Sequence, residues 1–317
     1  MPDDILLSVV VITYNHERFI RKALDSILMQ HTNFSFEILV GEDCSPDGTR
    51  AVLKEYEEKH PAVFRMFYRE KNMGATANYY DLKKRCRGKY IACLEGDDFW
   101  LDTCKLQKQV DFLEQNNQYI ACVHACKLVD NENADVDKPV NFSFYSGTVY
   151  TKKEFATGIF PGQTATLVYR NIFLQPAYDY SVMQSAHRYV SDRTLIMLLV
   201  MQGDIYCLKE VMSAYRYGSA SSFGRIKNLN YNLVEYFQTL ESYAETTFGV
   251  KKALIPAKKE LLGAVFGQVL KGDSAAKQTF AQLYKPYKEK GTLIAYLSGR
   301  TISYPFKALA RKLHKRT

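Results

Sequence analysis

Three carboxylates lie close together in the sequence, at Glu95, Asp97 and Asp98. They follow the apolar run Tyr90–Leu94, which is typical of a buried strand, and Gly96 relaxes the backbone between them. Carboxylates this close repel one another, and burial increases the repulsion, so they need either a cation or exposure to solvent. A solvated acidic loop and a cation site are therefore the two interpretations of this cluster.

The residues around the cluster alternate between strand and helix patterns. Apolar and β-branched runs predict four strands, at Leu7–Thr13, Phe36–Val40, Val63–Tyr68 and Tyr90–Leu94. Helical spacing predicts helices at Glu17–Met29, from Asp47 or Thr49 to Lys59, at Ala75–Lys84 and at Lys105–Leu113. This alternation over the first 115 residues predicts a parallel sheet covered by helices.

The pattern becomes less regular after Tyr119. We predict further strands at Tyr119–Leu128, Asn141–Tyr145, Thr148–Tyr150, Thr164–Tyr169, Asp204–Leu208 and Val211–Tyr217. Predicted helices lie at Asp192–Met201, Asn230–Phe248, Ala257–Leu270 and Ser274–Tyr284.

Polar loops follow three of the predicted parallel strands, beginning at Thr13, Glu42 and Glu95. Parallel strands place their carboxyl ends at one edge of the sheet, where open α/β sheets bind ligands. The loops contain neither a GxGxxG nor a GxxxxGK[ST] pattern, so no phosphate-cradling loop is present. A carboxylate-rich edge repels a bare diphosphate, but a divalent cation such as Mg²⁺ or Mn²⁺ bridges the two. The expected ligand is a metal-bound nucleoside diphosphate.

Composition points to a folded protein. The chain has 317 residues, 47% of them hydrophobic, which suits one large domain with an appendage or two domains. It shows no secretory signal pattern and no apolar run long enough to span a membrane. The seven cysteines are irregularly spaced, so we expect reduced thiols in a cytosolic protein.

Positive charge is concentrated towards the end of the chain. The whole chain carries +8, while residues 251–317 hold fifteen Lys and Arg against three acids, a net charge of +12. The first 250 residues therefore carry −4. The basic region could dock on anionic lipid, or it could be a solvated helical cap or a homo-oligomer contact. We expect no nucleic-acid partner, because the body is acidic and lacks recognised nucleic-acid motifs.

Five motifs occur together and in order, at Val9–Asn15, Glu42–Thr49, Asn72–Gly74, Gly88–Asp98 and Lys105–Gln109. On these motifs the chain resembles the family 2 glycosyltransferases of the GT-A fold, especially bacterial enzymes that build surface polysaccharides. The resemblance covers about residues 6 to 220. It implies an α/β fold with a Rossmann-like, mainly parallel sheet flanked by helices, followed by a helical C-terminal extension.

The resemblance also implies a domain organisation. Residues 1–220 form the GT-A domain, with a nucleotide-sugar-binding half at 1–115 and an acceptor half at 116–220. Residues 221–317 form the basic helical C-terminal region.

Roles in donor binding follow from the same resemblance. Thr13 and Tyr14 begin the nucleotide pocket, and Asp43 hydrogen-bonds the uracil ring. Glu95 and Asp97 resemble the DxD pair that binds the metal, with Asp97 as the direct ligand. The other nucleotide-sugar contacts are Asn15, Asn72, Gly74, Asn78, Asp98 and Arg216.

The chain departs from the family pattern at several positions. Glu95 and Cys44 stand where relatives often have Asp and Gly. The frequent Arg after the Asn-x-Gly turn is missing, with Asn78 in that area, and Tyr217 replaces a common His. The missing Arg removes one pyrophosphate or base contact expected for the family, and in the segment with Tyr217 only Arg216 is assigned a role.

The second half is expected to supply the acceptor site. In an inverting transfer the acceptor hydroxyl needs a general base, and Asp192 matches the catalytic Asp of the family. The alternative is that Asp192 only caps the helix that follows it. Gln163, Thr164 and Thr166 line the acceptor pocket in one interpretation and a polar strand edge in the other.

The sequence thus predicts an inverting, metal-dependent glycosyltransferase. It moves a sugar from a nucleotide-sugar, expected to be UDP-linked, to a glycan or lipid-linked acceptor at the inner face of the cell membrane. The competing hypotheses are a nucleotidyltransferase acting on sugar phosphates and a non-catalytic glycan-binding protein.

Overall fold

The computed structural model describes residues 5–137, 144–174, 176–187, 190–217 and 229–251. The chain divides into two compact units, Met1–Arg225 with Thr246–Gly249, and Ile226–Glu245 with Val250–Thr317. The central sheet belongs to the first unit.

The first half forms the predicted strand–helix alternation. Its parallel strands are β1 (Leu7–Thr13), β2 (Phe36–Glu42), β3 (Phe64–Tyr68) and β4 (Tyr90–Glu95), in the order β3-β2-β1-β4. The helices are α1 (Ile20–Leu28), α2 (Thr49–Lys59), α3 (Ala75–Lys83) and α4 (Lys105–Gln115). Element types are all as predicted, and the largest difference in bounds is the start of α1, at Ile20 instead of Glu17.

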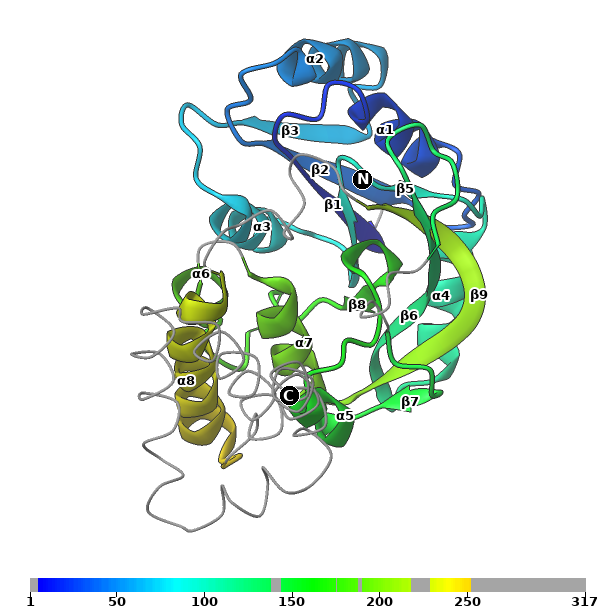
Figure 1. Ribbon diagram of the computed structural model, residues 1–317. Coiled ribbons are helices and arrows are strands. Elements are labelled where there is room, and N and C mark those ends of the chain that lie inside the picture. Colours follow the sequence, from blue (N-terminus) through cyan, green and yellow to red (C-terminus); the bar gives the residue numbers. More distant parts are fainter. Residues whose placement is uncertain (1–4, 138–143, 175, 188–189, 218–228, 252–317) are drawn as a thin grey trace, which may run out of the picture. The chain divides into compact units, whose positions relative to one another are not determined.

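Helices cover both faces of these strands. Figure 1 shows α1 and α2 on one side of β1–β3 and α3 on the other. Because side chains alternate along a strand, Val9 and Val11 pack with Leu24 and Ile27 of α1 in one buried cluster. Each fully buried side chain of this size stabilises the fold by about 1.5–3 kcal/mol. This packing fixes the sheet edge from which the polar loops project.

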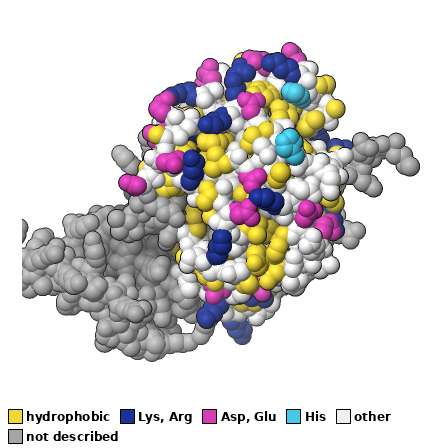
Figure 2. Space-filling model, turned by 90° about the vertical axis from the view of Figure 1, so that its right-hand side faces the viewer, with side chains coloured by type: hydrophobic (Ala, Val, Ile, Leu, Met, Phe, Trp, Pro, Cys, Tyr) yellow, Lys and Arg dark blue, Asp and Glu magenta, His cyan; other side chains and the backbone are white. Residues whose placement is uncertain are grey.

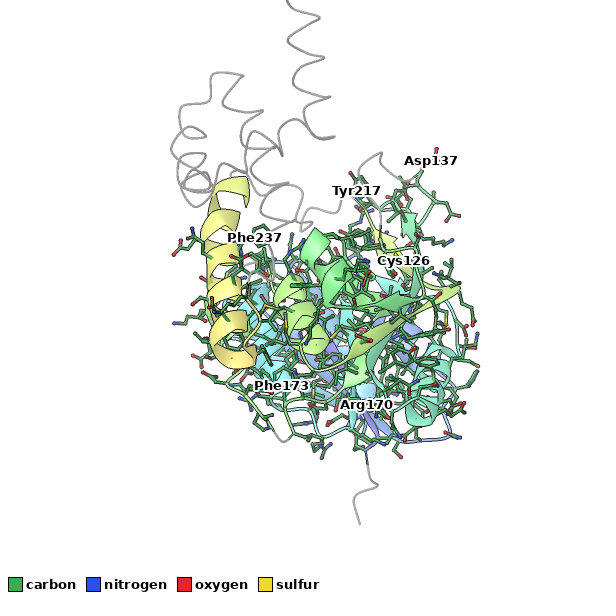
Figure 3. All side chains as sticks on the ribbon, turned by 90° about the horizontal axis from the view of Figure 1, so that it is seen from below. Cys126, Asp137, Arg170, Phe173, Tyr217 and Phe237 are labelled. Atoms are coloured by element: carbon green, nitrogen blue, oxygen red, sulfur yellow. The ribbon has the colours of Figure 1, made fainter. Side chains whose placement is uncertain are left out.

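The second half extends the sheet with mixed strand directions. Its strands are β5 (Phe99–Trp100), β6 (Tyr119–Val129), β7 (Val149–Tyr150), β8 (Val168–Arg170) and β9 (Asp204–Arg216). The order continues as β4-β8-β6-β9-β5, with β7 also paired to β9. β8 runs antiparallel to β4 and β6, whereas β6 and β9 are parallel. Arg170 and Tyr217 consequently lie at opposite ends of the sheet, as Figure 3 shows.

The remaining helices are short, apart from the last. They are α5 (Lys152–Thr157), a 3-10 helix at Thr164–Thr166, α6 (Val182–Ser185), α7 (Asp192–Val200) and α8 (Leu229–Phe248). The sequence pattern did not indicate α5, α6 or β5. The predicted strand at Asn141–Tyr145 falls largely outside the described residues, as do the predicted helices Ala257–Leu270 and Ser274–Tyr284.

One predicted strand of the second half is wrong in detail. The segment predicted as one strand, Thr164–Tyr169, begins as a 3-10 helix, and only Val168–Arg170 is strand. Local bonds explain this, because the Gln163 side chain accepts from Ala165 N and the Thr166 hydroxyl donates to Gln163 O at 2.7 Å. Such side-chain bonds compete with pairing in a sheet.

The predicted strands Asp204–Leu208 and Val211–Tyr217 are one continuous strand, β9. The register with β6 shifts between Val123 and Ala125, which pair with Cys207 and Val211. The extra residues of β9 form a bulge at this point. The bulge interrupts the alternation of apolar and polar residues in the sequence, which led to the prediction of two strands separated by a loop.

Lys105 is a fully buried lysine at the start of α4. Its Nζ lies 4.0 Å from the centre of the Trp100 ring. This nitrogen has no hydrogen-bond partner in the part of the chain that the structure describes. Burial lowers the pKa of Lys105 to about 7.

The buried lysine predicts a dependence of stability on pH. Its pKa rises from about 7 in the fold to an ordinary 10.5 on unfolding. Between these values the unfolded chain binds more protons, so the free energy of unfolding increases with pH, by at most about 1.4 kcal/mol per pH unit. We expect Lys105→Met to remove this slope and to be more stable than the wild type at neutral pH and below. Urea titrations between about pH 6 and 9 measure both effects; equal slopes would contradict the expectation.

The surface carries charges of both signs. On the face in Figure 2, Lys and Arg lie interspersed with Asp and Glu, with apolar side chains between them. None of the helices in the described ranges is both long and apolar enough to cross a bilayer.

Candidate active site

The three carboxylates lie at the end of β4 and in the tight turn that follows it. Asp98 N donates to Glu95 O at 3.0 Å, and Gly96 N donates to Ile12 O at 2.9 Å, which fastens the turn to β1. Oxygens of Glu95, Asp97 and Asp98 all lie within 4.8 Å of one another. We call residues Glu95–Asp98 the acid turn. Because Ile12 pairs with Glu95 and Thr13 with Glu42, the three polar loops meet at one sheet edge, as predicted.

Gly96 is required by close approach to β1. A Cβ at this position would lie 2.7 Å from Thr13 Oγ1 and 2.9 Å from His16 Nδ1. Both distances are too short for real contacts, so another residue would push the acid turn away from β1. The sequence indicated a flexible backbone here, whereas the structure shows that space decides the residue.

Asp98 holds the acid turn to the second half of the sheet. It is 1% exposed, and its Oδ1 accepts from Arg216 N and its Oδ2 from Gln163 Nε2, both at 2.8 Å. Burial raises the pKa of Asp98, and the Asp97 and Glu95 charges add to this. Asp98 therefore joins the ends of β4 and β9 and the segment before β8.

The Arg216 guanidinium is bound to protein groups around the acid turn. Its Nε donates to Asp97 O at 2.9 Å, its Nη2 to Asn133 Oδ1 at 2.8 Å, and its Nη1 to Asp130 O. The group also lies 4.3 Å from the centre of the Phe19 ring. Arg216 was predicted as a nucleotide-sugar contact and Gln163 as an acceptor contact. In the structure both support the acid turn.

Glu95 and Asp97 have the chemistry of a cation site. Glu95 is half-buried, and burial, followed by the Asp97 and Asp192 charges, raises its pKa to about 8. A divalent cation relieves this electrostatic cost, and carboxylate oxygens are the ligands that Mg²⁺ and Mn²⁺ prefer. The carboxylate oxygens of Glu95 and Asp97 therefore fit the divalent cation that the sequence predicted.

Asp43 orders the loop that follows β3. Its two carboxylate oxygens accept from Met73 N at 2.7 Å and Gly74 N at 2.9 Å, and its carbonyl accepts from Asn72 Nδ2 at 3.2 Å. Burial raises the pKa of Asp43, against the effect of the two backbone donors. The structure thus brings Asp43, Asn72 and Gly74 together.

The loops after β1 and β2 contain residues in the left-handed region. Asn15 has a φ of 58° and Cys44 a φ of 61°, a conformation that favours glycine. Asn15 N donates to Ser45 Oγ at 3.0 Å, which joins the two loops. Beside them the Tyr14 ring is 41% exposed. The positive φ at Cys44 is a conformation that glycine adopts without steric cost, which fits the glycine expected here from the family resemblance.

Asn78 is built into the packing of α3 against β2. Its Nδ2 donates to Gly41 O at 2.9 Å and its Oδ1 accepts from Arg69 Nε at 3.1 Å. The side chain is 1% exposed. A Cβ on Gly41 would lie 2.3 Å from Asn78 Oδ1, so this contact needs glycine.

Asp192 is the first residue of α7. The N-cap position is Ser191, which makes no side-chain cap bond, and Asp192 Oδ1 accepts from Arg193 N at 2.7 Å. Asp192 is exposed, yet the surrounding protein desolvates it enough to raise its pKa. Its charge also raises the pKa of Glu95. The charges of carboxylates from the two halves of the chain therefore interact.

Two residues near these carboxylates were not predicted from the sequence. Tyr215 precedes Arg216 on β9. Burial is the main cause that raises the pKa of its phenol, and the charges of the acid turn and of Asp192 raise it further. Lys83 is fully buried in α3, and its positive charge lowers the pKa of both Glu95 and Asp192. An odd tyrosine in a strand and a lysine at the end of a helix carry no signal of this in sequence.

The other predicted acceptor residues differ in exposure. Thr166 is fully buried, and its carbonyl accepts from Gln109 Nε2 at 3.0 Å. Thr164 is half-exposed. Of the two threonines, Thr164 has the more accessible side chain.

Comparisons with known proteins place this geometry in a family. Residues 8–173 match the family model described as glycosyl transferase family 2. An uncharacterized protein of Mycobacterium tuberculosis is 33% identical over 213 residues, which cover 66% of this chain and 58% of that protein. The match to this curated relative thus spans less than two thirds of its length.

Two further proteins carry functional descriptions. The Escherichia coli protein WfgD, described as a UDP-Glc:α-D-GlcNAc-diphosphoundecaprenol β-1,3-glucosyltransferase, is 31% identical over 43% of this chain and 51% of its own. The crystal structure of Staphylococcus aureus TarS residues 1–349 in complex with UDP-GlcNAc superposes with a TM-score of 0.67 at 18% identity, covering 88% of this chain and 79% of that one. The likeness to TarS confirms the predicted fold class.

Proposed function

The chain belongs to glycosyltransferase family 2, and we propose that it transfers a sugar, with inversion, from a UDP-linked donor to a lipid-linked glycan of the cell surface. One observation carries the proposal: the acid turn after β4 and Asp192 of α7, far apart in sequence, lie close enough for their charges to interact. A donor diphosphate and an acceptor base are required at one place in such a reaction.

The first half is proposed to bind the donor. Asp43 and the loop it orders, with Thr13 and Tyr14, lie beside the acid turn at the same sheet edge. We propose that the exposed Tyr14 ring packs on the base and that Asp43 accepts from the uracil N–H. Relatives support UDP, since TarS was crystallised with UDP-GlcNAc and WfgD is described with UDP-Glc.

A divalent cation, Mg²⁺ or Mn²⁺, would be held by Asp97 and Glu95. When bound, such an ion neutralises charge that develops on the leaving diphosphate. Asp98 keeps the acid turn in place through Arg216 and Gln163, so that the Asp97 carboxylate faces the donor. The scaffold thereby fixes the site before the donor binds.

The second half is proposed to bind the acceptor. Asp192 accepts the proton of the attacking hydroxyl, and its raised pKa suits a base that must also release the proton later. We propose that Thr164, which is half-exposed, contacts the acceptor.

The acceptor and the cellular location are part of the proposal. WfgD is described with a diphosphoundecaprenol acceptor, which supports a lipid-linked glycan at a membrane surface. All seven cysteines lie in described ranges and no disulfide joins them, as is usual in the cytoplasm. We propose that the basic region 221–317, which is outside the described residues except for 229–251, docks on anionic lipid.

Nucleotide binding tests the proposed function. We expect UDP to raise the melting temperature in the presence of Mn²⁺, and GDP and CMP to raise it less. A shift with UTP and a sugar phosphate, but not with UDP, would favour a nucleotidyltransferase. No shift with any nucleotide would overturn the enzyme proposal and favour a glycan-binding protein.

A further inference from the structure

His16 lies between the first polar loop and the acid turn. Its Nδ1 is 3.3 Å from Thr13 Oγ1, and its Nε2 is 3.7 Å from Asp97 Oδ2. The side chain is 7% exposed. A distance of 3.7 Å is too long for a direct hydrogen bond but close enough for attraction between a ring N–H and a carboxylate. The imidazole thus links β1 to the acid at which the cation is proposed to bind.

The backbone of His16 is fixed from two directions. Its N–H donates to Thr49 Oγ1 at 2.9 Å, and its carbonyl accepts from Phe19 N and Ile20 N, also at 2.9 Å. The ring lies close to Gly96, where a Cβ would come within 2.9 Å of Nδ1, so the imidazole occupies space that only glycine leaves open. Few conformations remain for this side chain, so its Nε2 presents a fixed group to Asp97.

We propose that His16 is a positioning residue of the donor site, which orients the Asp97 carboxylate towards the cation. The inference rests on the proposed metal-dependent function. Residues that orient a metal ligand without binding the metal themselves typically contribute 10- to 100-fold to metal affinity. His16 acts through Asp97 and is not itself proposed to touch donor or acceptor.

Titration of Mn²⁺ with UDP present, followed by the EPR signal of the free ion, tests this inference. We expect His16→Ala to raise the dissociation constant of Mn²⁺ about tenfold or more. His16→Gln, which keeps an N–H donor on a chain of similar reach, should recover most of the affinity. In UDP release from a UDP-hexose, His16→Ala should raise the Mn²⁺ concentration for half-maximal rate and change the rate at saturating Mn²⁺ much less.

His60→Ala provides the matched control, because His60 is an exposed histidine at the end of α2. It should bind Mn²⁺ like the wild type. If His16→Ala and His16→Gln bind Mn²⁺ with unchanged affinity, His16 does not position Asp97, and melting of the metal-free variants then reports only its packing role. A wild type that binds UDP but no Mn²⁺ would overturn the positioning role and the metal site together. A wild type that binds neither would overturn the proposed function itself.

Discussion

Asp97→Asn is expected to lower sugar transfer about a thousandfold at moderate Mn²⁺, since losing a metal contact in the transition state costs several kcal/mol. The amide keeps the size of the side chain but removes the negative charge. The melting temperature of the metal-free protein should stay the same or rise, because one of three repelling carboxylates becomes neutral. A UDP-release assay measures the loss of transfer, and thermal melting of the metal-free protein measures the effect on stability.

Asp98→Asn is the matched comparison for this variant. Both oxygens of Asp98 accept hydrogen bonds, and an amide would turn an N–H towards Arg216 N or Gln163 Nε2. We expect a loss of stability of about 1–3 kcal/mol, because a buried donor then lacks an acceptor. Should Asp97→Asn unfold the protein while Asp98→Asn removes Mn²⁺ binding, the roles assigned to these two acids would be reversed.

The second large effect is expected for Asp192→Asn. A general base contributes about 10²- to 10⁴-fold to a rate, so the rate of UDP release from the donor should decrease by a factor in that range. UDP should bind as in the wild type, because Asp192 belongs to α7 and not to the donor loops. The amide oxygen still accepts from Arg193 N, so the start of α7 is preserved.

A helix-capping role makes the opposite prediction. Asp192→Asn would then leave turnover unchanged, and only Asp192→Ala would lower stability, by about 1 kcal/mol. Glu154→Gln is a useful reference, because Glu154 caps α5 through Thr151 and is not proposed to act in catalysis. Equal turnover in Asp192→Asn and Glu154→Gln would remove Asp192 from the mechanism.

The sequence predicted the first half of the fold well because local and global signals agree there. Strands of β-branched residues and helices with one apolar face follow each other regularly. The carboxyl ends of parallel strands all lie at one edge of the sheet. The meeting of Thr13, Asp43 and Glu95 at one edge followed directly from that arrangement. In the second half, the bulge in β9 and the bonds of Gln163 broke the alternation that marks a strand.

The site was predicted by residue type more than by contact. Acids after strands are visible in a sequence, whereas the partner of a buried arginine is not. Arg216 bonds to a carbonyl 119 positions earlier in the chain, and no local pattern marks such a pair. His16 was a single histidine without a motif, and its proximity to Asp97 depends on the pairing of β1 with β4.

The bonds of Asp98 also bear on how relatives of this protein could exchange parts by recombination. Every carboxylate of the acid turn is encoded before residue 115, yet the groups that hold the turn, Gln163 and Arg216, are encoded after it. A chimaera joined near residue 115 would inherit the acids without their supports unless the incoming segment supplied equivalent ones. The proposed boundary between the donor and acceptor halves is therefore a poor crossover point, and a joint after β9 would transfer the acid turn together with its supports.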